Sequence, residues 1–137
     1  MPVADLDEAA LVRWGEEFGR ALNVPAFVTL SGDLGAGKTT LVRAIARAQG
    51  ATAPVTSQSY ALVSEYASRR GPVIHVDLYR LGGPAELPQI GWDDIVGARA
   101  IVLVEWPDRA EGFLPSGQLA LHLEHVDRRP DIRRLTW

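Results

Sequence analysis

The chain has 137 residues, a net charge of −3 and no cysteine. This length fits one domain over residues 1–137, with no room for a separate substrate domain. Disulfides and thiolate metal sites are therefore excluded, and the acidic balance argues against a large sequence-independent contact with nucleic acid. No secretory pattern opens the chain and no apolar run is long enough to cross a bilayer, so we expect a cytoplasmic protein without membrane contact.

The chain begins with a predicted helix over residues 5–22. Asp5 and Glu8 have the spacing of a capping box. Apolar side chains then recur on one stripe, at Leu11, Trp14, Phe18 and Leu22. An apolar run at residues 26–30 is typical of a buried strand. A glycine-rich loop connects this run to a second predicted helix over residues 38–49.

The middle of the chain alternates loops with apolar segments. Strands are predicted over three segments, residues 60–66, 73–78 and 100–104. Around them we expect loops at residues 51–59 and 107–116 and short helical pieces within residues 84–96.

The last part of the chain indicates a hairpin. Residues 118–124 alternate leucine with polar side chains, as in a strand with one solvated face. Residues 133–137 are expected to pair with it after a turn at residues 127–130. Apolar strands interleaved with helices indicate a three-layer α/β fold. We therefore predict a mixed, mainly parallel sheet with antiparallel strands added at the end.

A phosphate-binding motif lies between the first strand and the second helix. Residues 32–39 read Gly-Asp-Leu-Gly-Ala-Gly-Lys-Thr and match G-x-x-x-x-G-K-[ST]. Lys38, the only lysine of the chain, would reach the β- and γ-phosphates, and the Thr39 hydroxyl would bind magnesium. This pattern predicts a P-loop NTPase-like fold that binds ATP with Mg²⁺. The expected nucleotide contacts are Asp33, Leu34, Gly35, Ala36, Gly37, Lys38, Thr39 and Thr40.

Two acids, Asp77 and Glu105, each follow an apolar strand. Ligands of α/β sheets lie at the carboxyl ends of the strands, so both acids are expected beside the P-loop. One or both should hold Mg²⁺ together with Thr39, and their spacing does not decide which. The predicted catalytic residues are Lys38, Asp77 and Glu105.

Other polar residues have weaker functional interpretations. Ser59 or Thr56, in the loop after the P-loop helix, could sense the γ-phosphate through magnesium, although an ordinary polar loop is the favoured interpretation. We expect His75 to be a hydrogen-bonded core residue. The arginines at positions 128, 129, 133 and 134 are expected to line a solvated strand face.

Three runs of the chain resemble the TsaE-type ATPases, which assist threonylcarbamoyladenosine synthesis on tRNA. They are Leu-Ser-Gly-Asp-Leu-Gly-Ala-Gly-Lys-Thr-Thr at 30–40, His-Val-Asp-Leu-Tyr-Arg-Leu at 75–81 and Val-Glu-Trp-Pro at 104–107. The resemblance, from about Ala9 to Leu123, implies a slowly hydrolysing ATPase subunit. Its implied partners are TsaD-like and TsaB-like proteins, with tRNA contact indirect.

The resemblance also implies roles for single residues. Thr39 and Glu105 would be the magnesium ligands, and Asp77 the Walker-B-like acid. Trp106 would lie near the nucleotide or the partner surface. The chain departs from the family at Gln58, where a proline is usual, and at Leu11, where a threonine near the adenine is frequent.

Two other functions remain open at this stage. One is a small-molecule kinase, which usually needs an arginine-bearing lid. The spare segment 84–97 contains no arginine, although Arg109 could serve. The other is a nucleotide-dependent binding module without turnover.

Overall fold

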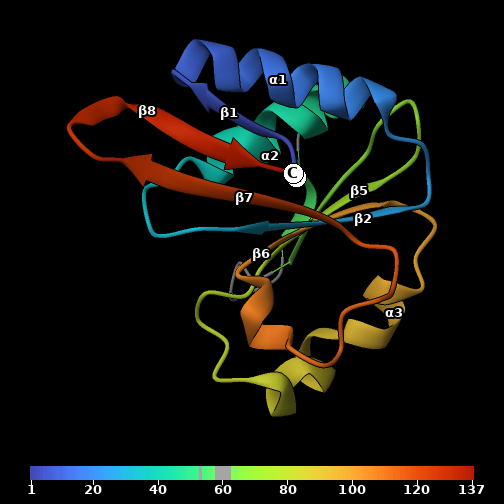
Figure 1. The fold of residues 1–137 in the computed structure, drawn as a ribbon. Helices are drawn as coiled ribbons and strands as arrows, with labels where there is room; N and C mark the ends of the chain where they lie inside the picture. Colours follow the sequence, from blue (N-terminus) through green and yellow to red (C-terminus); the bar gives the residue numbers. More distant parts are fainter. Residues whose placement is uncertain (53, 58–62) are drawn as a thin grey trace.

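The computed structural model describes residues 1–52, 54–57 and 63–137, and these form an α/β fold (Figure 1). The strands of the described residues are β1 (Val3–Leu6), β2 (Ala26–Ser31), β3 (Pro54–Ser57), β4 (Val63–Tyr66), β5 (Val73–Asp77), β6 (Ile101–Glu105), β7 (Leu119–Val126) and β8 (Arg129–Thr136). The helices are α1 (Glu8–Ala21), α2 (Lys38–Ala48), α3 (Trp92–Val96) and the 3₁₀ helices η1 (Pro84–Ile90) and η2 (Pro107–Ala110).

All strands of the described residues belong to one sheet, in the order β1-β8-β7-β2-β6-β5-β4-β3. Its centre is parallel, because β2 pairs with both β6 and β7, and β5 pairs with β6. Antiparallel pairs extend both edges, through β8 and β1 on one side and β4 and β3 on the other. The predicted mixed sheet with a parallel centre and a C-terminal antiparallel hairpin is confirmed.

Helical segments cover both faces of the sheet, which gives three layers (Figure 1). α1 and α2 lie on one face, over a core that includes Leu30, Leu41 and Leu103. η1, α3 and η2 lie on the other face, over a second core built around Trp92 and Val104. β6 is buried along its whole length because both faces are covered, as its continuous apolar sequence predicted.

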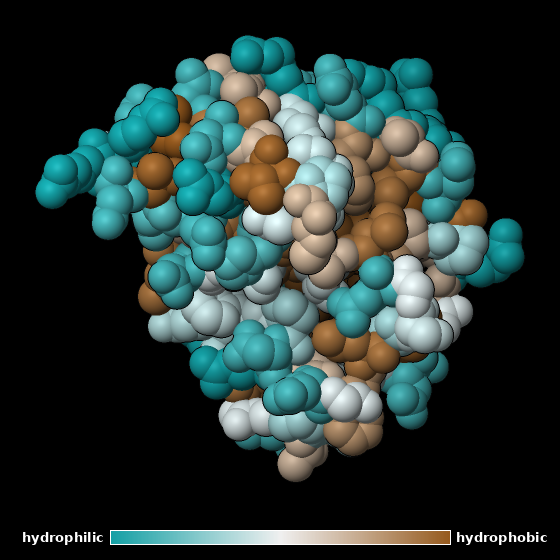
Figure 2. Space-filling view, in the orientation of Figure 1, coloured by the Kyte–Doolittle hydropathy of each residue, from teal (hydrophilic) through white to brown (hydrophobic). Residues whose placement is uncertain are grey.

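The two long helices approach each other closely through glycines of α1. A Cβ atom added to Gly19 would lie 2.7 Å from the carbonyl oxygen of Ile45, and one on Gly15 would lie 2.8 Å from the side chain of Leu41. The opposite, outer side of α1 is hydrophilic (Figure 2). The predicted stripe is therefore confirmed, with Leu11 and Leu22 in the core.

The start of the chain differs from the prediction. Residues 3–6 form the edge strand β1, and α1 begins after Asp7, whose carboxylate accepts a hydrogen bond from the N–H of Ala10. The predicted cap Asp5 instead bonds to Arg134 on β8. The local capping pattern was misleading because pairing with β8, far away in sequence, determines the conformation of this segment.

Two predicted loops contain regular structure. β3 lies within residues 51–59, where it pairs with β4, and η2 lies within residues 107–116. The short helical pieces expected within residues 84–96 are confirmed as η1 and α3. Within the described part of the chain, no helix is both long and apolar enough to cross a membrane.

Candidate nucleotide-binding site

The phosphate-binding motif forms the connection between β2 and α2. Gly32 adopts a φ of 139°, and a Cβ atom there would overlap the carbonyl oxygen of Leu123. Gly37 caps α2 with a φ of 102°, a conformation that side-chain-bearing residues rarely adopt. These glycines let the backbone turn tightly into the helix, whose N-terminus carries partial positive charge.

The Lys38 side chain is 5% exposed and lies inside this turn. Its Nζ donates hydrogen bonds to the carbonyl oxygens of Gly32 and Asp33, the latter at 3.0 Å. Nζ also lies 4.1 Å from the centre of the Trp106 ring. Burial lowers the pKa of the Lys38 ammonium, and the nearby Glu105 carboxylate opposes this shift.

The two predicted acids meet at the same edge of the sheet. Asp77 and Glu105 are direct partners in the parallel β5–β6 register. Glu105 is 3% exposed, and its Oε1 lies 3.5 Å from the Thr39 hydroxyl. Asp77 is less buried, and its Oδ1 accepts a hydrogen bond from the N–H of Tyr79 at 3.1 Å.

His75 is a member of this group whose contact the sequence did not predict. Its Nε2 lies 2.6 Å from Oε2 of Glu105, so the expected hydrogen bond is confirmed. The side chain is only partly buried, so it is not the core residue that was expected, and its partner is a candidate metal ligand. The sequence signal that could have placed His75 at the site is the alternation of side chains between the two faces of β5. His75 and Asp77 are two residues apart in a strand and therefore share one face.

A cavity of about 310 Å³ unites most of the predicted site. Its lining residues are Leu34, Gly35, Ala36, Gly37, Lys38, Thr39, Thr40, Asp77, Tyr79, Glu105 and Trp106. Asp33 lies outside this lining and faces a neighbouring cavity along β7. Tyr79, for which the sequence suggested no role, packs against Trp106, with ring centres 5.0 Å apart and ring planes inclined at 49°.

The donor atoms at this edge fit magnesium. Glu105, Asp77 and Thr39 supply hard oxygen atoms, and Mg²⁺ is usually bound by one or two carboxylates together with phosphate oxygens and water. Among residues 1–52, 54–57 and 63–137, no group of three or more His, Asp or Glu side chains is arranged to hold a metal by itself. This donor set therefore suits an ion shared with a phosphate ligand better than a permanent protein-only site.

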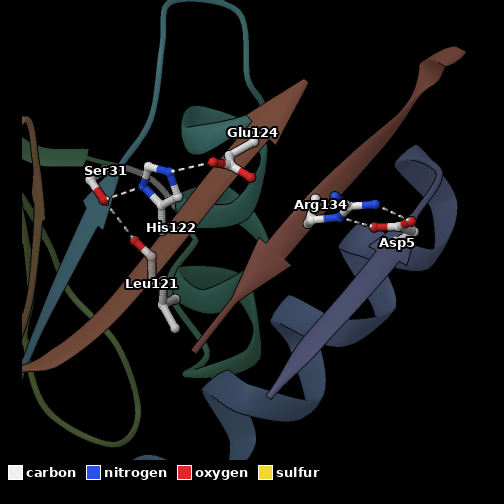
Figure 3. Close-up of polar contacts among 6 residues, drawn as sticks. All are labelled: Asp5, Ser31, Leu121, His122, Glu124 and Arg134. Carbon is white, nitrogen blue, oxygen red and sulfur yellow. Dashed lines mark hydrogen bonds and ion pairs between the residues drawn. The ribbon is translucent and has the colours of Figure 1, made fainter. Parts of the chain in front are cut away.

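The β7–β8 hairpin contacts the outer side of the P-loop. The Ser31 hydroxyl lies 2.7 Å from Nδ1 of His122, whose Nε2 lies 3.5 Å from Glu124 (Figure 3). His125 and Arg133 approach the carbonyl oxygens of Leu34 and Gly35, at 3.4 Å and 3.3 Å.

The C-terminal arginines also have specific partners. Arg134 forms two hydrogen bonds with Asp5 (Figure 3), and this contact lowers the pKa of the Asp5 carboxyl. Arg133 donates to the P-loop through its contact with Gly35. The prediction of a merely solvated arginine face is therefore incomplete for these two side chains.

Three other sequence interpretations have separate outcomes. Ser59 and Gln58 lie outside the described residues. The backbone of Thr56 forms part of β3, but its side chain is not among the described parts of the structure. Leu11 is 1% exposed in the core, where its Cδ2 lies beneath Gly37 and fills space behind the P-loop.

Comparisons with known proteins identify the family to which this chain is similar. Residues 6–134 match the family model of threonylcarbamoyl adenosine biosynthesis protein TsaE. The chain is similar to two proteins that bear the name tRNA threonylcarbamoyladenosine biosynthesis protein TsaE. The Haemophilus influenzae protein is 36% identical and the Mycobacterium leprae protein 37% identical, and each match covers 92% of this chain and 83% of the relative.

A solved structure shares the same architecture. The crystal structure of Bacillus subtilis YdiB superposes with a TM-score of 0.72 at 25% sequence identity, covering 98% of this chain and 85% of that one. The family match spans nearly the whole chain, including the P-loop, both acids and the strands that carry them. The chain therefore belongs to the TsaE family, a P-loop ATPase family of tRNA threonylcarbamoyladenosine biosynthesis.

Proposed function

We propose that this protein binds Mg·ATP in the P-loop cavity and hydrolyses it slowly as an accessory subunit of a TsaB–TsaD-type complex. In this function the protein supports threonylcarbamoyladenosine modification of tRNA and contacts the tRNA indirectly. The observation that carries the proposal is the meeting of Lys38, Thr39 and Glu105 in one cavity at the P-loop. Family membership supports the pathway.

Each residue of the site has a task that its position suits. The backbone N–H groups of residues 34–40 and the N-terminus of α2 would bind the phosphates. Lys38 would exchange its contacts with carbonyl oxygens for contacts with the β- and γ-phosphates. Thr39 and Glu105 would hold magnesium, which neutralises charge on the phosphates when it is bound.

Asp77 and Trp106 would complete the site from its open side. Asp77 lies beside Glu105 in the register, where its carboxylate would assist in holding magnesium, directly or through water. Trp106 covers the lysine and lies on the rim of the cavity. We expect this ring to contact either the nucleotide or a partner protein.

Phosphate release, measured with the purified protein alone and with purified TsaB-type and TsaD-type proteins, tests the proposal. We expect slow release by the protein alone and faster release with the partners. Release or transfer that requires an added metabolite would instead indicate a kinase. Binding without any release under all conditions would indicate a module without turnover.

Substitution of Lys38 tests the role of the site separately from the stability of the fold. Lys38→Ala removes the buried ammonium and should abolish phosphate release while the circular dichroism spectrum is preserved. Arg43→Ala is the matched control, because Arg43 is an exposed cation on the same helix. Unchanged turnover in Lys38→Ala would defeat the proposed mechanism.

A further inference from the structure

The two carboxylate oxygens of Glu105 have different neighbours. Oε2 lies 2.6 Å from Nε2 of His75, whereas Oε1 points toward the Thr39 hydroxyl at 3.5 Å. An ionised carboxylate can only accept hydrogen bonds, so this contact to Glu105 requires a His75 that carries its hydrogen on Nε2. One oxygen is therefore occupied by the protein, and the other faces the cavity.

The backbone arrangement makes this contact specific. β5 and β6 run parallel with Asp77 opposite Glu105 and His75 opposite Leu103. His75 is therefore level with a position two residues before Glu105, on the face of the sheet that carries α2. Its ring extends along the strand direction to contact the carboxylate. Glu105 is almost fully buried, so if His75 were replaced, water would have little access to form a hydrogen bond with Oε2 in its place.

We propose that His75 is a positioning residue for metal binding, which holds Oε2 of Glu105 and thereby presents Oε1 alone to the magnesium ion. This inference rests on the proposed function, in which Glu105 is a magnesium ligand. Without the histidine, the buried carboxylate can rotate and lose its alignment with the Thr39 hydroxyl. Partners that orient metal-binding carboxylates typically change metal affinity by about 10- to 100-fold when they are removed.

The test uses three substitutions that differ in where they place a donor. His75→Leu removes the donor and replaces the imidazole with an apolar side chain of similar bulk. His75→Gln places an amide nitrogen the same number of bonds from the backbone as Nε2. His75→Asn also carries an amide, but its reach corresponds to Nδ1, on the wrong side of the ring for this contact.

The measurement is the binding of a fluorescent ATP analogue, first in EDTA and then during a magnesium titration. For His75→Leu and His75→Asn we expect unchanged affinity in EDTA and a magnesium midpoint raised about 10- to 100-fold. His75→Gln should restore much of the wild-type midpoint. Thermal melting of each variant establishes that it is folded, and His75→Asn keeps the test valid if His75→Leu is not folded.

Other outcomes would overturn the inference in distinguishable ways. A wild-type magnesium midpoint in His75→Leu would remove the positioning role while leaving the proposed function intact. Equal weakening in EDTA and in magnesium would also overturn it, because it indicates general damage to the pocket. If the wild-type protein itself showed no magnesium-dependent binding, the proposed function would fail first, and this inference with it.

A double substitution gives an independent check. Because His75 is inferred to act through Glu105, adding His75→Leu to Glu105→Gln should not raise the magnesium midpoint further. Additive effects of the two substitutions would show that they act separately and would contradict the inference.

Discussion

The two layers that cover the sheet differ in regularity. One consists of two helices, α1 with 14 residues and α2 with 11, packed through small residues. The other consists of short pieces, η1, α3 and η2, of which the longest has 7 residues and contains two prolines, Pro84 and Pro88. The first layer is stabilised by helix–helix packing, and the second depends on a few large side chains such as Trp92.

The candidate site draws on both layers. Ala36 of the P-loop is buried in the core beneath α1 and α2, whereas Trp106 packs against the core of the second layer. The contact between Lys38 and Trp106 joins them. The regular layer therefore packs against the backbone of the P-loop, and the irregular layer packs against Trp106 at the rim of the cavity.

The largest expected effect concerns Trp92 in the irregular layer. This side chain is 3% exposed, donates a hydrogen bond to the Phe113 carbonyl at 2.9 Å and meets the Phe27 ring edge-on at 6.0 Å. Trp92→Ala should lower the free energy of unfolding by about 3–5 kcal/mol, measured by urea denaturation. Trp14→Ala, on the half-buried side of α1, should have a smaller effect. A loss for Trp92→Ala well below this range would indicate that the second layer does not depend on this anchor.

A smaller effect is expected from a methyl group added to the regular layer. Gly19→Ala places a Cβ against the backbone of α2, and this overpacking, about 1–3 kcal/mol, should exceed the helix-propensity gain of about 1 kcal/mol. Gly97→Ala is the matched control in the other layer, where the nearest atom to a Cβ is Asp93 O at 3.4 Å. Urea denaturation should show a loss for Gly19→Ala and little change for Gly97→Ala. The reverse order would mean that the helices can separate freely.

The smallest effect belongs to the edge of the sheet, outside both layers. Arg134 lowers the pKa of the Asp5 carboxyl below its ordinary value. The resulting stabilisation is present above the ordinary pKa of an aspartate and is lost as the pH falls through the lowered pKa. Asp5→Asn should therefore lower Tm slightly near neutral pH, and the difference from wild type should disappear in acid. A difference that persisted in acid would mean that the Asp5 charge is not its source.

The sequence predicted the centre of this fold better than its edges. The apolar runs of β2, β5 and β6 and the motif between β2 and α2 are strong local signals, and the structure brings them together as expected. β1 and β3 are short edge strands, and the conformation of β1 depends on pairing with β8, which is far away in the sequence. A local pattern such as the spacing of Asp5 and Glu8 can then suggest the wrong element.

The candidate site shows the same division. Lys38, Thr39, Asp77 and Glu105 could be found because each stands at a recognisable position in a motif or at a strand end. The contact between His75 and Glu105 joins residues on separate strands and depends on their register. The number of residues between His75 and Glu105 does not determine how β5 and β6 align. The contact could therefore be identified only from the folded structure.

The position of Lys38 has a consequence for the choice of ligand. Its ammonium has already exchanged most of its water for two backbone oxygens and an aromatic face. A ligand that binds Lys38 must therefore replace its contacts with these neutral protein groups. A multiply charged phosphate chain would do this far better than an uncharged nucleoside, because its attraction to the ammonium is much stronger. Under the proposed function, the P-loop would therefore select its ligand first of all by charge.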